Sequence, residues 1–266
     1  MSNPLVRMKV GFGRWARIAW YAGLRVRCPC CGWRGRRFPR GELAGAKCPG
    51  CHTNERLRNA WVYLRDYTPL LTAPLRLLHV APEPVIQRRL RGCPNLHYLS
   101  ADLESPRAEK HFDLTAIPYP DASFDVIICM HVLEHIPDDR AAMREMRRVL
   151  TPEGWALLQV PIGRGRETTF EDWSVVTPED RTRVFGQCDH VRIYGHDYVD
   201  RLREARFAVE IDPAIRNLPV HVHRRHGLKP EDMYICRPDG ALERDGARET
   251  GAAGSDARRN VALRRD

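Results

Sequence analysis

The feature of this sequence that most restricts its fold is the alternation, after residue 74, of short apolar runs with helical patterns. The apolar runs have the length of strands, and they are LRLLHV, LHYLSAD, FDVIICM and GWALLQV. Between them lie two helical patterns, PVIQRRLRG and DDRAAMREMRRVL. Continuous apolar strands suit a parallel sheet that helices cover on both faces. The order of elements therefore predicts an α/β fold with a doubly wound, mostly parallel sheet.

The residues that follow are expected to complete this sheet. DYVDRLREA predicts a last helix, and FAVEID and DMYICR predict two closing strands. A chain of 266 residues, 43% of them hydrophobic, can bury one substantial core and still form a small additional module. The expected segments are a basic lead-in (1–27), a zinc ribbon (28–52), a linker helix (53–74), the main domain (75–236) and a disordered tail (237–266).

The zinc ribbon is predicted from the spacing of four cysteines. Cys28, Cys31, Cys48 and Cys51 form two C-x2-C pairs that a gap of 16 residues separates. Each pair can direct two thiolates at one point, and two pairs complete a tetrahedral Zn²⁺ site. Because four sulfur ligands leave no open position, this zinc is expected to be structural.

Positive charge is concentrated in the first part of the chain. Residues 1–60 contain 13 Lys and Arg against 2 Asp and Glu, whereas the whole chain carries +9. A basic module on a near-neutral body suggests a phosphate-bearing partner such as RNA, although solubility alone would explain the same charge. Residues 5–26 are expected to form a basic amphipathic helix, packed on its own domain or lying on a membrane or on RNA. Arginines interrupt every long apolar run, so we expect a cytoplasmic protein with no membrane span.

The most specific stretch runs from Phe112 to Pro161. It contains DLTAIPY, SFDV, LEH and RVLTPEG, in that order. This set of motifs resembles the type-11 group of class I S-adenosylmethionine-dependent methyltransferases, and the resemblance extends over residues 75 to about 210. It implies that the chain is a methyltransferase with S-adenosylmethionine as its cofactor. A zinc ribbon in front of such a domain is similar in architecture to some ribosomal-RNA methyltransferases.

The resemblance also implies a set of cofactor-binding residues. Asp102, at the end of the second strand, matches the acid that binds the cofactor ribose, since a carboxylate can accept hydrogen bonds from two vicinal hydroxyls. Asp113 and Leu114 match the turn that meets the adenine. Met130 and His131 fall where the family lines the methionine end of the cofactor. The alternatives are a surface acid for Asp102 and a turn cap for Asp113.

The first loop departs from the family's pattern. The family has an acid followed by G-x-G-x-G, whereas this chain has His79 in place of the acid and Ala81, Pro82 and Glu83 across the glycines. Glycine is favoured there because the turn needs a positive φ. We still expect His79, Ala81 and Glu83 to line the cofactor, with Glu83 near its cationic amine. Glu83 would otherwise be an acid that the dipole favours at a helix N-terminus.

The acceptor site is expected in residues 162–196, an insertion too long for a plain connection. Its aromatic and polar side chains suit a polar or anionic substrate, and they are Trp173, Phe185, Gln187, Asp189, His190, Arg192 and Tyr194. His190 is the first candidate for a general base, because the ordinary pKa of histidine is about 6.5. His131 and His135 are its rivals. A histidine hydrogen-bonded within its own loop is the alternative.

Three functions are compatible with these patterns. The chain could methylate a small molecule, with the zinc ribbon as a structural cap. It could instead methylate RNA that the basic N-terminal module binds. The third possibility is a non-catalytic nucleic-acid or protein-binding adaptor whose domain has lost its cofactor. Binding of S-adenosylmethionine separates the first two functions from the third.

Overall fold

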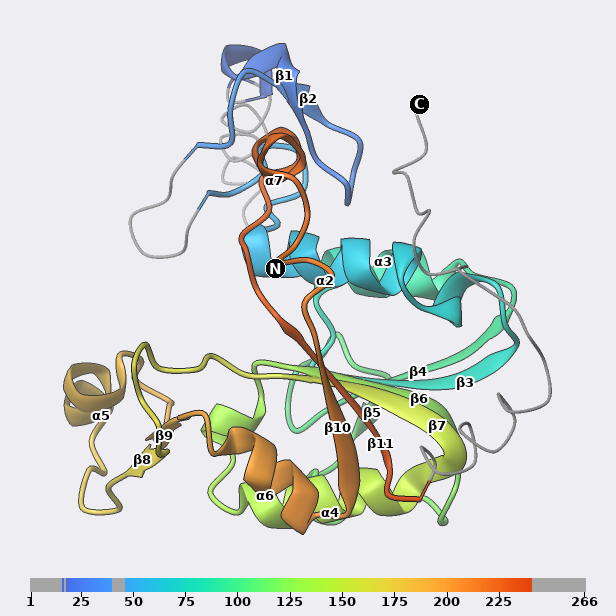
Figure 1. Cartoon of the computed structure of the whole chain (residues 1–266), viewed down its shortest axis with the longest axis vertical. Coiled ribbons are helices and arrows are strands. Elements are labelled where there is room, and N and C mark those ends of the chain that lie inside the picture. The colour runs from blue at the N-terminus through green and yellow to red at the C-terminus, as the bar shows by residue number, and fades with distance from the viewer. Residues whose placement is uncertain (1–15, 17, 40–45, 241–266) are drawn as a thin grey trace, which may run out of the picture. The chain divides into compact units, whose positions relative to one another are not determined.

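The structure is a computed structural model that describes residue 16, residues 18–39 and residues 46–240. The described chain divides into two compact units (Figure 1). Unit 1 contains the described residues up to Leu71 together with Pro213–Met233, and unit 2 contains Thr72–Asp212 together with the residues from Tyr234 onward. Residues 213–233 thus belong to the unit of the cysteines, although the sequence placed them in the main domain. The first 15 residues and the expected tail beyond residue 240 lie outside the described residues.

Unit 2 is built on a seven-stranded sheet in the order β5-β4-β3-β6-β7-β11-β10. Its strands are β3 (Leu75–Val80), β4 (Leu96–Asp102), β5 (Lys110–His111), β6 (Phe124–Met130), β7 (Leu150–Gln159), β10 (Phe207–Asp212) and β11 (Met233–Pro238). The pairs from β5 through β7 are parallel, and β11 runs antiparallel to β7. The predicted doubly wound, mostly parallel sheet is confirmed. Because β11 extends to Pro238, the ordered chain continues into the segment expected to be a tail.

Helices cover both faces of this sheet. The helical elements of unit 2 are α3 (Pro84–Arg91), the 3-10 turn η2 (Leu133–His135), α4 (Asp139–Val149), α6 (Tyr198–Glu204) and, in the insertion away from the sheet, α5 (Pro178–Phe185). Figure 1 shows α3 on one face and α4 and α6 on the other. The Asp138 side chain accepts a hydrogen bond from Ala141 N and so caps α4. Met143 and Met146 of α4 are completely buried, as the helical spacing of these residues predicts.

The central strands form the core of unit 2. Val126, Ile127 and Ile128 are consecutive in β6 and all have 0% exposure. Successive side chains of a strand point to opposite faces, so this continuous burial requires cover on both sides. The insertion after β7 has structure of its own, namely α5 and the short strands β8 (Phe170–Glu171) and β9 (Arg192–Ile193), which the sequence analysis did not predict.

Unit 1 contains the cysteine turns, and several elements lie entirely within its described residues. These are β1 (Ala22–Arg27), β2 (Arg34–Gly35), α2 (Glu55–Asp66) and α7 (Val220–His226), with the 3-10 turn η1 (Pro69–Leu71) after α2. The expected helix over residues 5–26 is therefore wrong for residues 22–26, which form a strand. Pairing of β1 with β2 satisfies backbone groups beside the first cysteine turn, which a helix here would leave without that partner. None of the helices in the described chain has the length and hydrophobicity needed to cross a bilayer.

A buried arginine holds the parts of unit 1 together. Arg58 of α2 has 0% exposure, and its guanidinium donates to the carbonyls of Thr53, of Ala46 at 2.8 Å and of Gly227 at 2.9 Å. Its guanidinium carbon also lies 4.3 Å from the centre of the Phe38 ring. A buried charge needs such partners, because burial without them is costly. These bonds explain why residues after 213 join the cysteine unit, although they are far from it in sequence.

Candidate functional site

Three parallel strands of unit 2 end at the same level of the sheet. Val80 of β3 is in register with Ala101 of β4 and with Cys129 of β6. The residues that follow, Ala81 and Asp102 among them, therefore lie side by side at the carboxyl edge of the sheet. In open α/β sheets, this edge is where ligands bind.

The first turn has a glycine-like backbone without a glycine. Ala81 has φ 46°, in the left-handed region, and its N–H donates to the Ala101 carbonyl at 2.8 Å. This conformation costs an ordinary residue about 1 kcal/mol, and it persists only where the surroundings impose it. The turn thus keeps the shape for which the family uses glycine, even though its sequence departs from the family's pattern.

The end of β4 presents a fixed carboxylate beside an exposed apolar side chain. Asp102 Oδ1 accepts hydrogen bonds from Glu104 N at 2.9 Å and Ser105 N at 2.8 Å. Its second oxygen has no hydrogen bond within the described chain, so it can accept from a ligand hydroxyl. Leu103 is 62% exposed. The sequence analysis missed Leu103, and its only signal was an apolar residue directly after the acid that ends the strand.

His79 and Glu83 bind each other. His79 is fully buried, and it shares hydrogen bonds with the Tyr98 hydroxyl through Nδ1 at 2.9 Å and with Glu83 Oε2 through Nε2 at 3.0 Å. Burial raises the pKa of Tyr98, so its hydroxyl stays protonated and able to donate. Glu83 precedes α3 without capping it. Its carboxylate is therefore already engaged by His79, and the expected contact with a cofactor amine stays a prediction.

Asp113 and Leu114 have different surroundings. Asp113 is exposed, and its Oδ1 accepts a hydrogen bond from Thr115 N at 2.8 Å. This is the turn-capping role that the sequence left open beside adenine binding. Leu114 is 7% exposed and belongs to the hydrophobic core of unit 2. Their contact with a cofactor also stays a prediction.

A cluster of histidines and a carboxylate follows β6. Met130 ends this strand with 5% exposure, and His131 comes next with φ 55°. His131 Nδ1 lies 3.5 Å from Glu134 Oε1. The rings of His135 and His190 meet edge to face, with centroids 4.7 Å apart. The structure therefore brings both predicted catalytic histidines, His131 and His190, to the carboxyl end of one strand.

Glu134 is the most unusual member of this cluster. Its side chain is 2% exposed, and its Oε2 has no hydrogen-bond partner in the described chain. Ligand atoms of Glu134, His135 and His190 all lie within 4.8 Å of one another. His190 is 6% exposed, so it packs inside this cluster and does not project from the insertion.

Arg192 and Tyr194 are structural, which corrects their expected place in a substrate-binding set. The Arg192 guanidinium has 0% exposure and donates to the carbonyls of Leu133 at 2.8 Å, of Pro137 at 2.7 Å and of Ile136. The Tyr194 hydroxyl donates to Asp139 Oδ2 at 2.6 Å. Buried carbonyls need donors, and Arg192 supplies them to η2 and the residues after it, while the Tyr194 hydroxyl is bound by Asp139. Of the predicted set, Trp173, Gln187 and Asp189 are exposed, Trp173 with 55% exposure.

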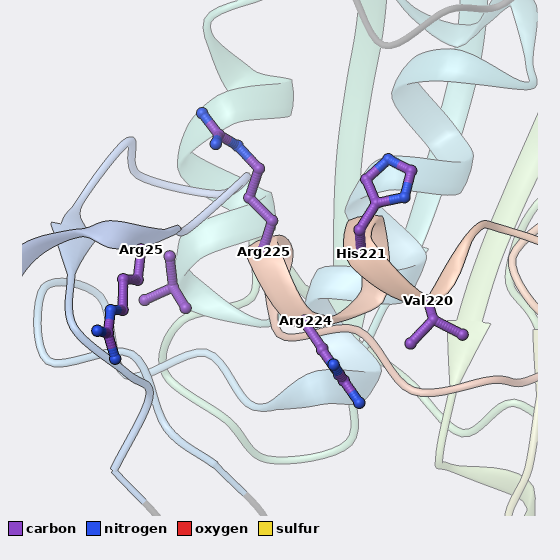
Figure 2. A pocket seen from close by; sticks show the side chains of 6 residues that line it. Arg25, Val220, His221, Arg224 and Arg225 are labelled. Atoms are coloured by element: carbon purple, nitrogen blue, oxygen red, sulfur yellow. The ribbon is translucent and has the colours of Figure 1, made fainter.

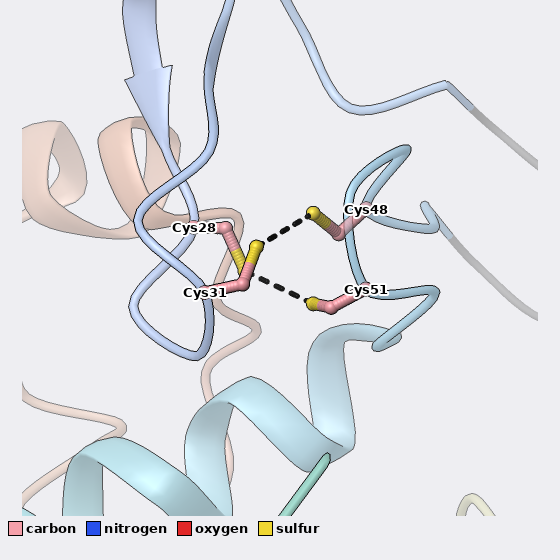
Figure 3. A group of neighbouring side chains, drawn as sticks. All are labelled: Cys28, Cys31, Cys48 and Cys51. Atoms are coloured by element: carbon pink, nitrogen blue, oxygen red, sulfur yellow. Dashed lines mark hydrogen bonds between the residues drawn. The ribbon is translucent and has the colours of Figure 1, made fainter. Parts of the chain in front are cut away.

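The four cysteines of unit 1 converge as their spacing predicts (Figure 3). Cys28 and Cys51 have their sulfurs 3.6 Å apart, as do Cys31 and Cys48, and the four sulfurs all lie within 4.8 Å of one another. Sulfurs around a tetrahedral zinc are about 3.8 Å apart, given a Zn–S distance of about 2.3 Å. Hydrogen bonds from Cys30 and the other thiols lower the pKa of Cys28, which favours the thiolate. The donor set and its spacing therefore fit Zn²⁺.

Unit 1 also carries a basic hollow (Figure 2). Its lining residues come from β1 and α7, and they are Arg25, Val26, Val220, His221, Arg224 and Arg225. His226 Nδ1 lies 3.1 Å from the Arg27 carbonyl, which ties α7 to β1. Partial burial lowers the pKa of the half-buried His226, which favours its neutral imidazole. None of the lining residues is acidic, so the hollow suits an anion.

Part of unit 2 is similar in sequence to known methyltransferases. Residues 85–158 match the model of a family described as a methyltransferase domain. The chain is 34% identical over 106 residues to a malonyl-(acyl-carrier protein) O-methyltransferase of Halorhodospira halophila. It is 33% identical over 109 residues to a 27-O-demethylrifamycin SV methyltransferase of Amycolatopsis mediterranei. These matches cover 39% and 40% of this chain, and 32% and 37% of the relatives, so they span about a third of the relatives' length.

Solved structures were also compared. An S-adenosylmethionine-dependent methyltransferase from Mesorhizobium loti aligns with a TM-score of 0.44 and 18% sequence identity, over 67% of this chain and 97% of that one. The match to the family model covers residues 85–158, which run from α3 into β7 and carry the motifs. Unit 2 therefore has the α/β fold of the class I methyltransferases, and its similarity to that family supports methyl transfer as its general chemistry.

Proposed function

We propose that unit 2 binds S-adenosylmethionine at the carboxyl edge of β3, β4 and β6 and transfers its methyl group to an acceptor. One observation carries this proposal: the left-handed turn at Ala81 lies in register with the fixed carboxylate of Asp102. The strained conformation at Ala81 costs free energy, and it is not expected to persist in a domain that no longer binds the cofactor. The alternative of a non-catalytic adaptor is accordingly less well supported.

The residues at this edge fit the parts of the cofactor. The unbonded oxygen of Asp102 would accept from the ribose hydroxyls, and the exposed Leu103 would pack on the flat adenine. Met130 and His131 would lie along the methionine end. Asp113 is exposed at the end of the neighbouring loop, where it could accept from the adenine amine.

The chemistry requires mostly positioning. The bound cofactor supplies an electrophilic methyl group on a sulfonium. Attack must be in line, so most of the acceleration comes from holding the acceptor at near-attack distance, and a base is needed only for an acceptor that loses a proton. His131 is the better-placed candidate base, because its side chain is 19% exposed whereas His190 is 6% exposed.

The test of this proposal is cofactor binding by the Asp102→Asn variant. Asparagine keeps an oxygen for the backbone amides of Glu104 and Ser105 but removes the charge. Isothermal titration should show S-adenosylmethionine and S-adenosylhomocysteine binding to the unaltered chain, and a loss of about tenfold or more for D102N, which is roughly 1.4 kcal/mol. Asp200→Asn, in the exposed pair with Arg203, is the matched control and should bind normally. Absence of binding to the unaltered chain would reject the methyltransferase proposal.

We also infer that Cys28, Cys31, Cys48 and Cys51 hold a structural Zn²⁺. Two sulfur pairs at 3.6 Å support this inference, together with the Thr53 hydroxyl, which lies 3.1 Å from Cys51 Sγ and can orient that ligand. All four ligands are protein thiols, so the ion would stabilise unit 1 without taking part in catalysis.

The acceptor is a small molecule or RNA. Both relatives are methyltransferases, and one is an O-methyltransferase, which supports transfer to oxygen. The basic hollow of unit 1 specifically favours RNA, because three arginines and a histidine line it without any carboxylate. A salt-dependent RNA affinity that depends on this hollow is the observation that separates the two acceptors.

A further inference from the structure

We propose that Glu134, His135 and His190 of unit 2 bind one divalent transition-metal ion, at a centre separate from the four cysteines. The three side chains come from the η2 turn and from the insertion before β9. Their ligand atoms all lie within 4.8 Å of one another, close enough for a single ion to contact all three.

The buried carboxylate of Glu134 is the strongest sign of a ligand. This side chain is 2% exposed, and its Oε2 has no hydrogen-bond partner in the described part of the chain. A buried carboxylate oxygen without a donor is strongly unfavourable, and proteins avoid it unless a cation or a donor completes the site. The imidazole of His131 lies 3.5 Å from the other oxygen, Oε1. A metal ion at Oε2 would supply the missing positive charge.

The surroundings of His135 match those of a metal ligand. Its Nδ1 lies 3.3 Å from the Asp189 carbonyl oxygen and 3.3 Å from Asp189 Oδ2. Ligating histidines usually donate one ring N–H to a carbonyl or a carboxylate, which fixes the ring and leaves the other nitrogen for the metal. Asp189 is thus a positioning residue for His135.

The fold brings His190 to this place by specific bonds. Val191 N donates to the Glu134 carbonyl at 3.0 Å, so the residue after His190 is attached to the η2 turn. The buried Arg192 then donates to the carbonyl of Leu133 in η2 and to that of Pro137 just after it. Two neighbours of His190 are therefore fixed to the segment that carries the other two ligands, which makes the cluster a built site.

The ligand set indicates the kind of ion. Two imidazoles suit Zn²⁺, Fe²⁺, Co²⁺ or Ni²⁺ better than Mg²⁺ or Ca²⁺, and one added carboxylate is common in catalytic sites of such metals. Three protein ligands leave positions open for a small ligand. This centre therefore differs in kind from the cysteine site, where all four positions are filled by sulfur.

A role for the ion rests on the proposed methyltransferase function. An open position could take a hydroxyl oxygen of the acceptor, and the ion would lower the pKa of that hydroxyl. The hydroxyl proton would then leave to solvent, the oxygen would bond to the methyl carbon, and the electron pair of the broken carbon–sulfur bond would stay on sulfur. His190 would be a ligand in this scheme, so the enzyme would not need it as a general base.

The first test is titration of Co²⁺ into tag-free, full-length protein that keeps its bound zinc, followed by calorimetry and visible absorbance. We expect one Co²⁺ to bind without the intense sulfur-to-cobalt charge-transfer band that thiolate ligands produce. Glu134→Gln and His190→Asn should each weaken this binding by more than about tenfold, since loss of even a ligand's partner costs about 10- to 100-fold. His97→Gln removes an exposed histidine at the opposite end of the sheet and should bind as the unaltered chain does.

Thermal unfolding provides a second readout that does not depend on activity. Co²⁺ should raise the Tm of the unaltered chain, because a ligand that binds only the folded state stabilises it. It should not raise the Tm of Glu134→Gln. Without Co²⁺, Glu134→Gln should unfold at the same temperature or a higher one, because it removes a buried, unsatisfied charge. A lower Tm for this metal-free variant would mean that Glu134 has protein partners and would overturn the proposal.

The remaining outcomes are equally decisive. No Co²⁺ binding, binding only with the thiolate band, or equal binding by all variants would reject the metal centre. S-adenosylmethionine titration of the same samples distinguishes this failure from failure of the proposed function. Cofactor binding without Co²⁺ binding rejects the metal centre alone, and Co²⁺ binding without cofactor binding rejects the methyltransferase proposal alone.

Discussion

Two alanines of unit 2 hold a backbone conformation that usually requires glycine. Ala81 has φ 46° at the proposed cofactor edge, and Ala122 has φ 56° in the turn before β6. The methyl group is disfavoured at both positions by about 1 kcal/mol, although glycine would lose more entropy on folding. Substitutions at these two positions can therefore distinguish the effect of the left-handed conformation on stability from its effect on cofactor binding.

We predict that Ala81→Gly and Ala122→Gly each leave the free energy of unfolding unchanged or raise it by up to about 1 kcal/mol, because relief of strain outweighs the entropy term. Ala81→Val should lower it by more than about 1 kcal/mol, since a β-branched residue is worse in this region. Urea unfolding measures the change. Only the substitutions at Ala81 should also alter cofactor affinity, and an equal effect from Ala122→Gly would contradict the assigned edge.

The insertion of unit 2 is attached to the domain by a buried network of charges. Glu171 of β8 accepts from Arg192 at 2.6 Å and from Arg201 of α6 at 2.8 Å, and Arg201 also donates to Asp139 of α4 at 3.0 Å. Burial acts to raise the pKa of Glu171, but the hydrogen bonds from Arg201 and Arg192 outweigh it and lower this pKa overall. The network therefore fixes the loop that carries His190.

This network predicts a specific dependence on pH. A carboxylate whose folded pKa is lowered stabilises the fold above its unfolded pKa, about 4.3 for Glu, and this contribution is lost as pH falls through the folded value. Glu171→Gln should lower the free energy of unfolding at pH 7 by about 1–3 kcal/mol, because hydrogen bonds to charged groups are lost. The deficit should shrink below about pH 4. Urea titrations at several pH values, with the exposed Glu210→Gln as control, test this expectation.

If RNA binds in the hollow between β1 and α7, its affinity should depend on the salt concentration through the arginines that line this hollow. Each phosphate contact with single-stranded RNA contributes a slope of about −0.7 to a plot of log affinity against log salt. The double variant Arg224→Ala/Arg225→Ala should bind RNA more weakly. Its slope should be less steep by about 0.7 if one phosphate contact is lost and by about 1.4 if two are lost. Fluorescence anisotropy with a labelled single strand measures the slope. Arg88→Ala, an exposed arginine of α3, should leave it unchanged, and an equal loss from Arg88→Ala would mean that charge alone binds RNA.

The complete chain consists of two units with different sources of stability. Unit 2 has a continuous apolar core that extends from β4 to β11. Within its described residues, unit 1 includes a two-stranded sheet and the helices α2 and α7, and its interior includes the charged Arg58 and the cysteine turns. So small an assembly usually needs a metal or disulfides to remain folded.

Loss of the zinc should therefore unfold unit 1 selectively. In Cys48→Ser, or after chelation, we expect rapid hydrogen exchange in β1 and the N-terminal part of α2, since metal binding and folding are coupled in such modules. Unit 2 should keep its protection against hydrogen exchange and its affinity for the cofactor. Cys30→Ser is the control, because Cys30 lies between the ligands Cys28 and Cys31 of the first turn but outside the group of four sulfurs. Unchanged exchange in a zinc-free chain would contradict the structural role.

The sequence was sufficient for features that depend on local patterns. The run FDVIICM in β6 and the spacing of Met143 and Met146 in α4 identify strand and helix, because burial repeats with the period of each element. The two C-x2-C pairs indicate a metal site because the spacing of each pair is also a local pattern, complete within one turn. The shape of the turn at Ala81 was not predictable from its residues, because the positive φ there is imposed by the surrounding fold.

Tertiary structure alone decided which distant residues meet. The proximity of His190 to His135 depends on Arg192, which the sequence suggested as a substrate ligand but which binds Glu171 and the carbonyls of Leu133 and Pro137. The inclusion of α7 in unit 1 depends likewise on the bond from Arg58 to Gly227. Such contacts satisfy buried polar groups between segments far apart in the chain, so no local period records them, whereas the apolar period of a strand or helix is set by its own residues.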